Sequence, residues 1–148
     1  MKILNKKQIK NILNTLNQQF GTSLDLDYVF LQSEKDKVFI VTKNIEKINL
    51  KNFRQINSIG LYFAKIERDG IRLSIEGSQL IGKKATKNIL ELKDPTEWLQ
   101  GKDIPNKTKL SGYFLIKHKN DFLGTGKAIE TKIMNFVPKI RRISELVS

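Results

Sequence analysis

The sequence of 148 residues contains no cysteine and a single histidine, His118. The lack of cysteine excludes a disulfide framework, a thiol nucleophile and a zinc–thiolate centre, and one histidine excludes a multi-histidine metal site. No stretch approaches about 18 consecutive apolar residues, and the opening MKILNKKQIKN lacks the apolar core of a signal peptide. These absences lead us to expect a soluble, cytoplasmic protein with no membrane partner.

Enzyme signals are also missing. The Gly-Thr-Gly-Lys stretch at 124–127 suggests a phosphate-binding loop, but a P-loop would need glycine at Asp121 and a hydroxyl at Ala128. A dinucleotide fingerprint would need glycine at Ile129. We interpret the two glycines instead as a bulge or a close backbone approach in a curved barrel strand. Carboxylates are scattered among basic residues, and His118 lies between two lysines, so we expect no catalysis and no cofactor.

Positive charge is the strongest global feature. The chain has 27 Lys+Arg against 15 Asp+Glu, a net charge of +12 and a pI near 9.9. Such a field attracts polyanions such as RNA, DNA or an anionic membrane. A lysine-rich proteome, in which lysine simply covers solvated faces, would give the same balance, and composition alone leaves that alternative open.

Apolar periodicity organises the first half of the chain. Residues 5–20 follow a helical pattern, and Gly21 is placed to end that helix. Strands are predicted at 28–32 and 38–43, joined by SEKDK, and a helix at 45–56. SIGLYFAKIERDGIRLSIEG then predicts a hairpin around an Asp69-Gly70 turn, with Ile71, Leu73 and Ile75 on one face of its second strand. Residues 77–86 are interpreted as a connection between two units.

The second half has the pattern of a small β-barrel. A short strand, NILELKD, precedes a helix with Asp94 as N-cap, Pro95 at its first position and Gly101 at its end. A basic turn at 105–109, a hairpin over 111–130 bending at 119–121, and an extended stretch over 132–143 follow. We therefore expect an α+β fold with an N-terminal α/β domain over 1–80 and a C-terminal barrel over 81–148.

Candidate binding residues gather near the C-terminus. Lys139, Arg141 and Arg142 follow Phe136 and Pro138, and arginine can contact phosphates and stack on bases. Phe136 has two interpretations, a base-stacking ring or a core residue. Asn135 has two as well, reading a base edge or holding a turn. Further lysines, which can reach the same groove only if the fold brings them there, are Lys83, Lys84, Lys107 and Lys109.

The second half also resembles a known family. This family is the PUA domain, a small RNA-binding β-barrel. Its first strand, helix and Gly-x-Asp turn are similar to ILELKDPTEWLQGKDI. Its hairpin, which ends in Gly-x-Gly-Lys-Ala, is similar to SGYFLIKHKNDFLGTGKA. MNFVPKIRR resembles the Lys-Asn-x-x-Pro-Lys-x-x-Arg tail of the PUA-like domain in 5-methylcytosine RNA methyltransferases, with Met134 as a departure. PNKTK stands where a Pro-Gly-Val turn is common. The segment INSIGLYFAKIERDGIRLSI resembles the pre-PUA domain of a stand-alone pre-PUA plus PUA ribosome-biogenesis family of eukaryotes and archaea.

This resemblance implies a non-catalytic RNA-binding protein. It would act in rRNA processing and ribosome biogenesis, or as a targeting factor in rRNA or tRNA modification, with an RNA-modifying enzyme or a pre-ribosomal particle as a further partner. The alternative is a protein-interaction module that docks on such a partner. RNA would lie along the first barrel helix, the loop after it and a late strand. Together with the charge analysis, this gives the candidate RNA-binding residues Lys83, Lys84, Gly101, Lys102, Lys107, Lys109, Lys127, Asn135, Lys139, Arg141 and Arg142.

Overall fold

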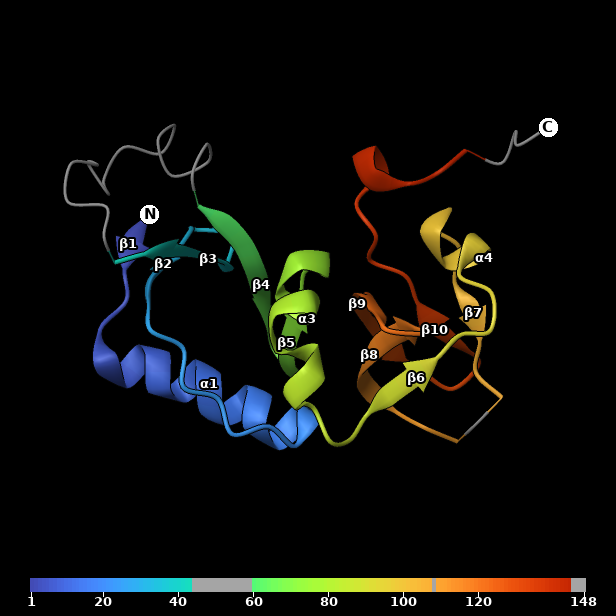
Figure 1. The fold of residues 1–148 in the computed structure, drawn as a ribbon, viewed down its shortest axis with the longest axis horizontal. Coiled ribbons are helices and arrows are strands. Elements are labelled where there is room, and N and C mark those ends of the chain that lie inside the picture. The colour runs from blue at the N-terminus through green and yellow to red at the C-terminus, as the bar shows by residue number, and fades with distance from the viewer. Residues whose placement is uncertain (44–59, 108, 145–148) are drawn as a thin grey trace.

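The described part of the chain contains two five-stranded sheets, with a short helix between them (Figure 1). The computed structural model describes residues 1–43, 60–107 and 109–144. The helix expected at 45–56 lies outside these residues. No helix in the described ranges is both long enough and apolar enough to cross a membrane.

The first sheet is antiparallel, with its strands in chain order. Its strands are β1 (Lys2–Ile3), β2 (Tyr28–Gln32), β3 (Lys37–Thr42), β4 (Leu61–Glu67) and β5 (Gly70–Leu73). The predicted strands at 28–32 and 38–43 are thus confirmed, the second shifted by one residue.

Helix α1 (Lys6–Phe20) confirms the first predicted helix. Asn5 begins it with a capping box, in which Asn5 and Gln8 each accept a hydrogen bond from the other's backbone N–H. Its apolar stripe, Ile12, Leu16 and Phe20, is buried. Gly21 ends the helix in the left-handed region at φ 62°, where glycine is favoured.

The hairpin of β4 and β5 differs from its prediction in two ways. Glu67 pairs with Gly70, so the two-residue turn is Arg68-Asp69, one position earlier than expected. The second strand ends at Leu73, and residues 75–81, expected to continue the strand and then form a connection, are helix α3 (Ile75–Ile81). Ser74 caps this helix by accepting a hydrogen bond from the Gly77 N–H at 2.9 Å.

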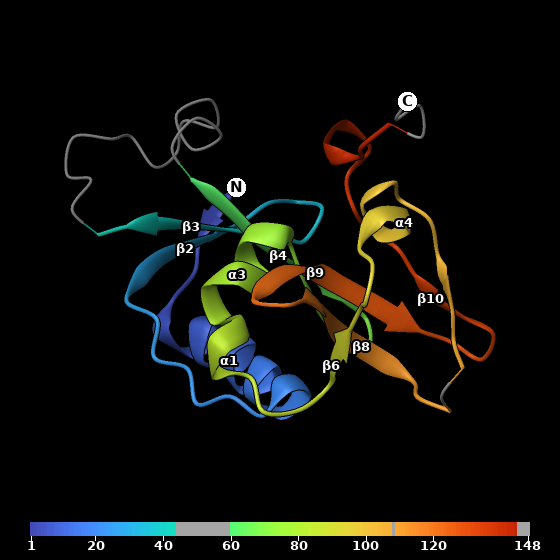
Figure 2. The ribbon, with the colours of Figure 1, turned by 45° about the vertical axis from the view of Figure 1, so that its right-hand side comes forward.

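The second sheet has the order β6-β8-β9-β10-β7 and curls into a half-barrel (Figure 2). Strands β6 and β8 are parallel, and the other neighbours are antiparallel. The elements are β6 (Ile89–Glu91), α4 (Thr96–Leu99), β7 (Ile104–Pro105), β8 (Gly112–His118), β9 (Asp121–Ala128) and β10 (Lys132–Met134). The α+β class and the C-terminal barrel are thus confirmed. The extended stretch expected through 143 is wrong at Lys139–Arg141, which forms a 3₁₀ turn, η2.

The glycines of β9 are explained by close packing. A Cβ on Gly126 would lie 2.7 Å from Ile133 Cγ2 and 2.9 Å from Trp98 Cη2, so no larger residue fits without a shift. Gly124 needs glycine for a different reason, because its φ of 91° lies in the region that favours glycine. The Gly-Thr-Gly-Lys stretch therefore shapes a curved strand, as its spacing predicted.

The two sheets share a hydrophobic core. Tyr113, Leu115 and Phe122 of the second sheet belong to the same buried cluster as Phe20 of α1 and Ile71 of β5. A second cluster surrounds Trp98, whose indole N–H donates to the Leu123 carbonyl at 2.9 Å. The division proposed between residues 80 and 81 falls inside α3, whose buried Ser78 accepts a hydrogen bond from the Gly124 N–H at 2.8 Å.

The segment between α3 and β6 is held against the end of α1. A 3₁₀ turn, η1 (Gly82–Lys84), follows α3. After it, the Thr86 and Lys87 N–H groups donate to the Phe20 carbonyl at 2.8 and 3.2 Å. The Asn88 side chain donates to the Gln19 carbonyl at 2.6 Å. These bonds satisfy carbonyls that the helix itself leaves without partners. The connection between the two units is therefore fixed in place along this stretch.

Candidate nucleic-acid interface

The segment after β10 is fixed to α4 by Asn135. The Asn135 amide donates to the carbonyls of Trp98 and Lys102 at 2.7 and 2.9 Å, and its oxygen accepts from the Val137 N–H at 2.7 Å. Its backbone N–H donates to Asp103 at 2.8 Å, and this bond is the main reason that the pKa of Asp103 is lowered. Of the two interpretations of Asn135, this geometry favours the one in which it holds a turn.

Arg142 lies over the backbone at Gly101. Its Nε donates to the Val137 carbonyl at 3.1 Å, and a Cβ on Gly101 would overlap the Arg142 guanidinium. Gly101 has φ 86°, so it needs glycine for its conformation as well. The backbone of Ile143 donates to the Leu99 carbonyl at 3.0 Å, which continues the contact between this segment and α4.

These contacts bring five of the predicted site residues to one region of the barrel. Gly101 and Lys102 follow α4, while Asn135, Lys139 and Arg142 lie in the segment that packs against it. Lys102, Lys139 and Arg142 are exposed. We call this group the α4 face.

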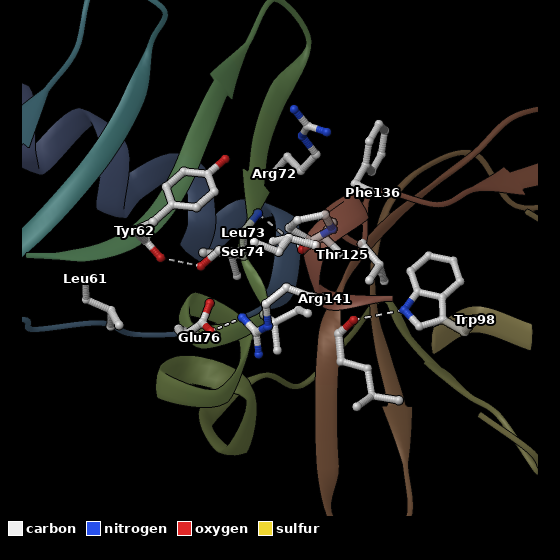
Figure 3. Close-up of a pocket in the computed structure, with 16 residues that line it drawn as sticks. Leu61, Tyr62, Arg72, Leu73, Ser74, Glu76, Trp98, Thr125, Phe136 and Arg141 are labelled. Carbon is white, nitrogen blue, oxygen red and sulfur yellow. Dashed lines mark hydrogen bonds and ion pairs between the residues drawn. The ribbon is translucent and has the colours of Figure 1, made fainter. Parts of the chain in front are cut away.

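Arg141 turns away from the α4 face toward the first unit. Its guanidinium forms an ion pair with Glu76 in the first turn of α3 (Figure 3). Glu76 sits at the N-terminal end of that short helix, where a carboxylate is favoured. The ion pair is formed through Nη1, and a guanidinium carries five N–H donors in all.

The remaining predicted site residues lie elsewhere. Lys107 and Lys109 are exposed in the loop between β7 and β8. Lys83 and Lys84 are exposed in η1, which follows α3 at the bottom of the view in Figure 1, whereas η2 lies at the top. Lys127 lies at the junction of the sheets, where its ammonium is 2.7 Å from Asp69. The structure therefore does not gather all the predicted cations on one face.

A cleft between the two units was not predicted. It has a volume of about 370 Å³ and is lined by β4, β5 and α3 on one side and by α4, β9 and residues 136–138, 140 and 141 on the other. Arg72 of β5 lies over the Phe136 ring, with its guanidinium carbon 4.0 Å from the ring centroid (Figure 3). Phe136 is half-buried and outside the buried core clusters of the described residues. The sequence does reveal Phe136 as a candidate, but its contact with Arg72 comes from the tertiary fold.

Several ionisable groups in the described part of the chain form ion pairs. No cluster of three or more His, Asp or Glu side chains that could hold a metal occurs among the described residues. Tyr62, on the wall of the cleft, has its pKa raised mainly by burial. His118 Nδ1 lies 2.9 Å from the Leu92 carbonyl at the edge of the barrel, outside the lining of the cleft.

Comparison with known proteins shows that the second half is similar to a known family. Residues 87–143 match the family described as the methyltransferase RsmF PUA domain. Ribosomal RNA small subunit methyltransferase F of Aeromonas hydrophila is 25% identical over 136 residues, which is 90% of this chain and 28% of the enzyme. The protein of the same name from Aeromonas salmonicida is 27% identical over 88 residues, 57% of this chain and 18% of the enzyme.

The chain thus spans less than a third of the length of these relatives, and the longer match extends from the barrel into the first unit. The likeness of the first unit to a pre-PUA domain stays a prediction. The resemblance of the second half is confirmed, and residues 87–143 form a PUA domain related to those of 5-methylcytosine RNA methyltransferases.

Proposed function

We propose that this chain is a non-catalytic, cytoplasmic RNA-binding unit that acts in rRNA processing or targets the modification of rRNA or tRNA. The observation that carries the proposal is the match of residues 87–143 to the PUA domain of a methyltransferase family. The relatives are named as small-subunit rRNA methyltransferases, which makes small-subunit rRNA the first RNA to test. The net charge of +12 supports a polyanionic partner.

The α4 face and the neighbouring Arg141 supply the proposed phosphate contacts. Lys102, Lys139 and Arg142 are exposed there, and Arg141 has donors beyond its bond to Glu76. Phosphate contacts fix the position of an RNA without reading its sequence. With roughly four such contacts on a single strand, log K falls against log salt with a slope of about −3. The other exposed lysines in η1 and the β7–β8 loop would extend the same electrostatic field.

Matched charge variants test this proposal. Lys139→Gln, Arg141→Gln and Arg142→Gln together remove three cations near the end of the PUA domain. Lys6→Gln, Lys7→Gln and Lys10→Gln remove three exposed cations from α1. Binding of small-subunit rRNA fragments is measured across a salt series, and folding is checked by urea denaturation. We expect the first variant to bind about tenfold or more weakly, with the salt slope reduced by about 2, and the α1 variant to bind nearly as the parent does.

Equal binding by the folded C-terminal variant and the parent would contradict the assignment of this segment. No binding of the parent to any RNA, even at low salt, would contradict the proposed function itself.

A protein-interaction module remains the second candidate, favoured by one observation. Ile140 in η2 is 95% exposed beside the cleft, although isoleucine is usually buried. An RNA-modifying enzyme or pre-ribosomal particle that packs on this side chain would be retained after nuclease treatment. In that case, Ile140→Ser should abolish the retention while RNA binding persists. This candidate would be excluded if the partner were lost after nuclease treatment and if Ile140→Ser retained it as well as the parent does.

A further inference from the structure

The cleft between the two units has the dimensions and the walls of a ligand site. Its volume of about 370 Å³ falls in the range of small-molecule pockets, about 300–1,000 Å³. Apolar side chains, among them Ile75, Leu123 and Val137, form much of its surface. Aromatic and cationic groups come from both units, with Tyr62 and Arg72 on one side and Phe136 and Arg141 on the other (Figure 3).

The ring of Phe136 is held in place before any ligand arrives. Its neighbours on both sides are fixed, because the Asn135 side chain bonds two carbonyls near α4 and accepts from the Val137 N–H. Arg72 covers the ring, and its own Nη2 lies 3.1 Å from Glu67. An aromatic ring that is already positioned loses little conformational entropy when a second flat group stacks on it.

Arg72 retains an unused donor in this arrangement. Its Nε is buried and has no hydrogen-bond partner among the residues that the structure describes. A buried donor without a partner is costly, so it points to a missing acceptor. Nucleobases carry such acceptors at the edge of a flat, largely apolar ring, and guanidinium planes and aromatic rings are the groups on which unpaired bases stack.

We propose that this cleft receives one unstacked base of a single-stranded RNA. Phe136 and Arg72 hold the base by stacking and hydrogen bonding, and Arg141 contacts a neighbouring phosphate through donors that its bond to Glu76 leaves over. This inference rests on the proposed function and adds the class of RNA and the position of one nucleotide. The charge of the cleft favours RNA over an apolar peptide, because two of the three charged residues among its described lining, Arg72 and Arg141, are arginines, and the third is Glu76.

The experiment uses the full chain and a short single-stranded RNA from the region it binds, with 2-aminopurine replacing individual bases. Stacking of this fluorescent base on Phe136 changes its emission, which locates the base that enters the cleft. Phe136→Leu keeps an apolar side chain but removes the ring, and Phe136→Tyr keeps the ring. We expect Phe136→Leu to weaken single-strand binding about tenfold without altering the salt slope, since no charge is lost, while Phe136→Tyr binds as the parent does.

Two further variants keep the test decisive. Tyr28→Leu replaces a half-buried aromatic of β2, outside the lining of the cleft, and should leave binding unchanged. Arg72→Lys keeps the charge but loses the planar group, and should weaken binding severalfold even if Phe136→Leu fails to fold.

Normal binding by the folded Phe136→Leu and Arg72→Lys variants, with weak binding by the C-terminal charge variant, would overturn the base site and leave the proposed function standing. Failure of the parent to bind RNA would instead overturn both. Loss of a protein partner in Phe136→Leu, with RNA affinity intact, would overturn the base site and identify the cleft as a protein-docking surface.

Discussion

The carboxylate of Asp69 lies 2.7 Å from the ammonium of Lys127, across the junction of the two sheets. Asp69 belongs to the turn between β4 and β5, and Lys127 belongs to β9. The other oxygen of the carboxylate accepts a hydrogen bond from the Tyr113 hydroxyl at 2.8 Å. One acidic side chain of the first unit thus contacts two residues of the PUA domain, and the pKa of Tyr113 is raised by burial and then by this bond.

Acid should weaken this junction. The hydrogen bond from Lys127, and then the one from Tyr113, lower the pKa of Asp69 in the folded protein. Because the folded-state pKa is lowered, the ionised Asp69 stabilises the fold at pH values above the unfolded-state pKa of about 3.9. This contribution is lost as the pH falls through the folded-state pKa. Asp69→Asn keeps an acceptor for Tyr113 but removes the charge.

Between about pH 6 and about pH 3, the urea midpoint of Asp69→Asn should therefore fall less than that of the parent. Asp25→Asn, at an exposed position, serves as the control. A parent-like pH dependence in Asp69→Asn would show that the ion pair contributes nothing.

The side chain of Gln19 should stabilise the fold, although Gln19 is polar and lies near the end of a helix. Its amide accepts from the Ile71 N–H at 2.7 Å and donates to the Ile71 carbonyl at 2.9 Å. Strand β5 is an edge strand, so these groups have no partner strand. Gln19→Ala should lower the free energy of unfolding by about 1–3 kcal/mol, while the exposed neighbour Gln18→Ala should change it by less than about 0.5 kcal/mol. Equal effects in urea denaturation would contradict the proposed role of the Gln19 amide.

Local patterns in the sequence were sufficient for most elements of the fold. Helix α1, its glycine end and the hairpin of β8 and β9 depend on neighbours in the chain, and all were predicted. Helix α3 was not, because Ile71, Leu73 and Ile75 alternate as in a strand. The competing signals were Ser74 as an N-cap and the helical spacing of Ile75, Ser78 and Ile81, all buried. Because the helix has only seven residues, its helical pattern is too short to outweigh the strand-like alternation of Ile71, Leu73 and Ile75.

The candidate site could be predicted only as a set of residue types. The sequence identifies the cations near the C-terminus and offers Phe136 as a stacking residue. It does not show that Arg72 covers Phe136, that Arg141 pairs with Glu76, or that Lys127 pairs with Asp69. Each of these contacts joins the first unit to the second, and such distant pairs are set by how the two sheets pack together.

Gly101 and Gly112 provide a matched pair for separating strain from a clash. Both have positive φ, 86° and 90°, but a Cβ on Gly112 would meet nothing within 4 Å, whereas one on Gly101 would overlap Arg142. Alanine at either position should cost about 1–3 kcal/mol through backbone strain. Only Gly101→Ala should also displace Arg142 and weaken RNA binding, measured by titration well below the melting temperature. Equal RNA affinities for the two variants would indicate that Arg142 does not contact RNA.

Asn135 should stabilise the α4 face without reading a base. Its side chain already donates to the carbonyls of Trp98 and Lys102 and accepts from the Val137 N–H. Asn135→Ala should lower the free energy of unfolding by about 1–3 kcal/mol. Asn135→Asp keeps the acceptor for Val137 but places a carboxylate against two carbonyl oxygens, so it should destabilise at least as much. Asn14→Ala, at an exposed position of α1, serves as the control.

For both Asn135 variants, RNA affinity measured where they remain folded should stay within about twofold of the parent, because phosphate contacts by Lys102, Lys139 and Arg142 do not require the amide itself. A large loss of affinity for one base identity, with stability unchanged, would instead show that the Asn135 amide leaves its carbonyl partners to read that base.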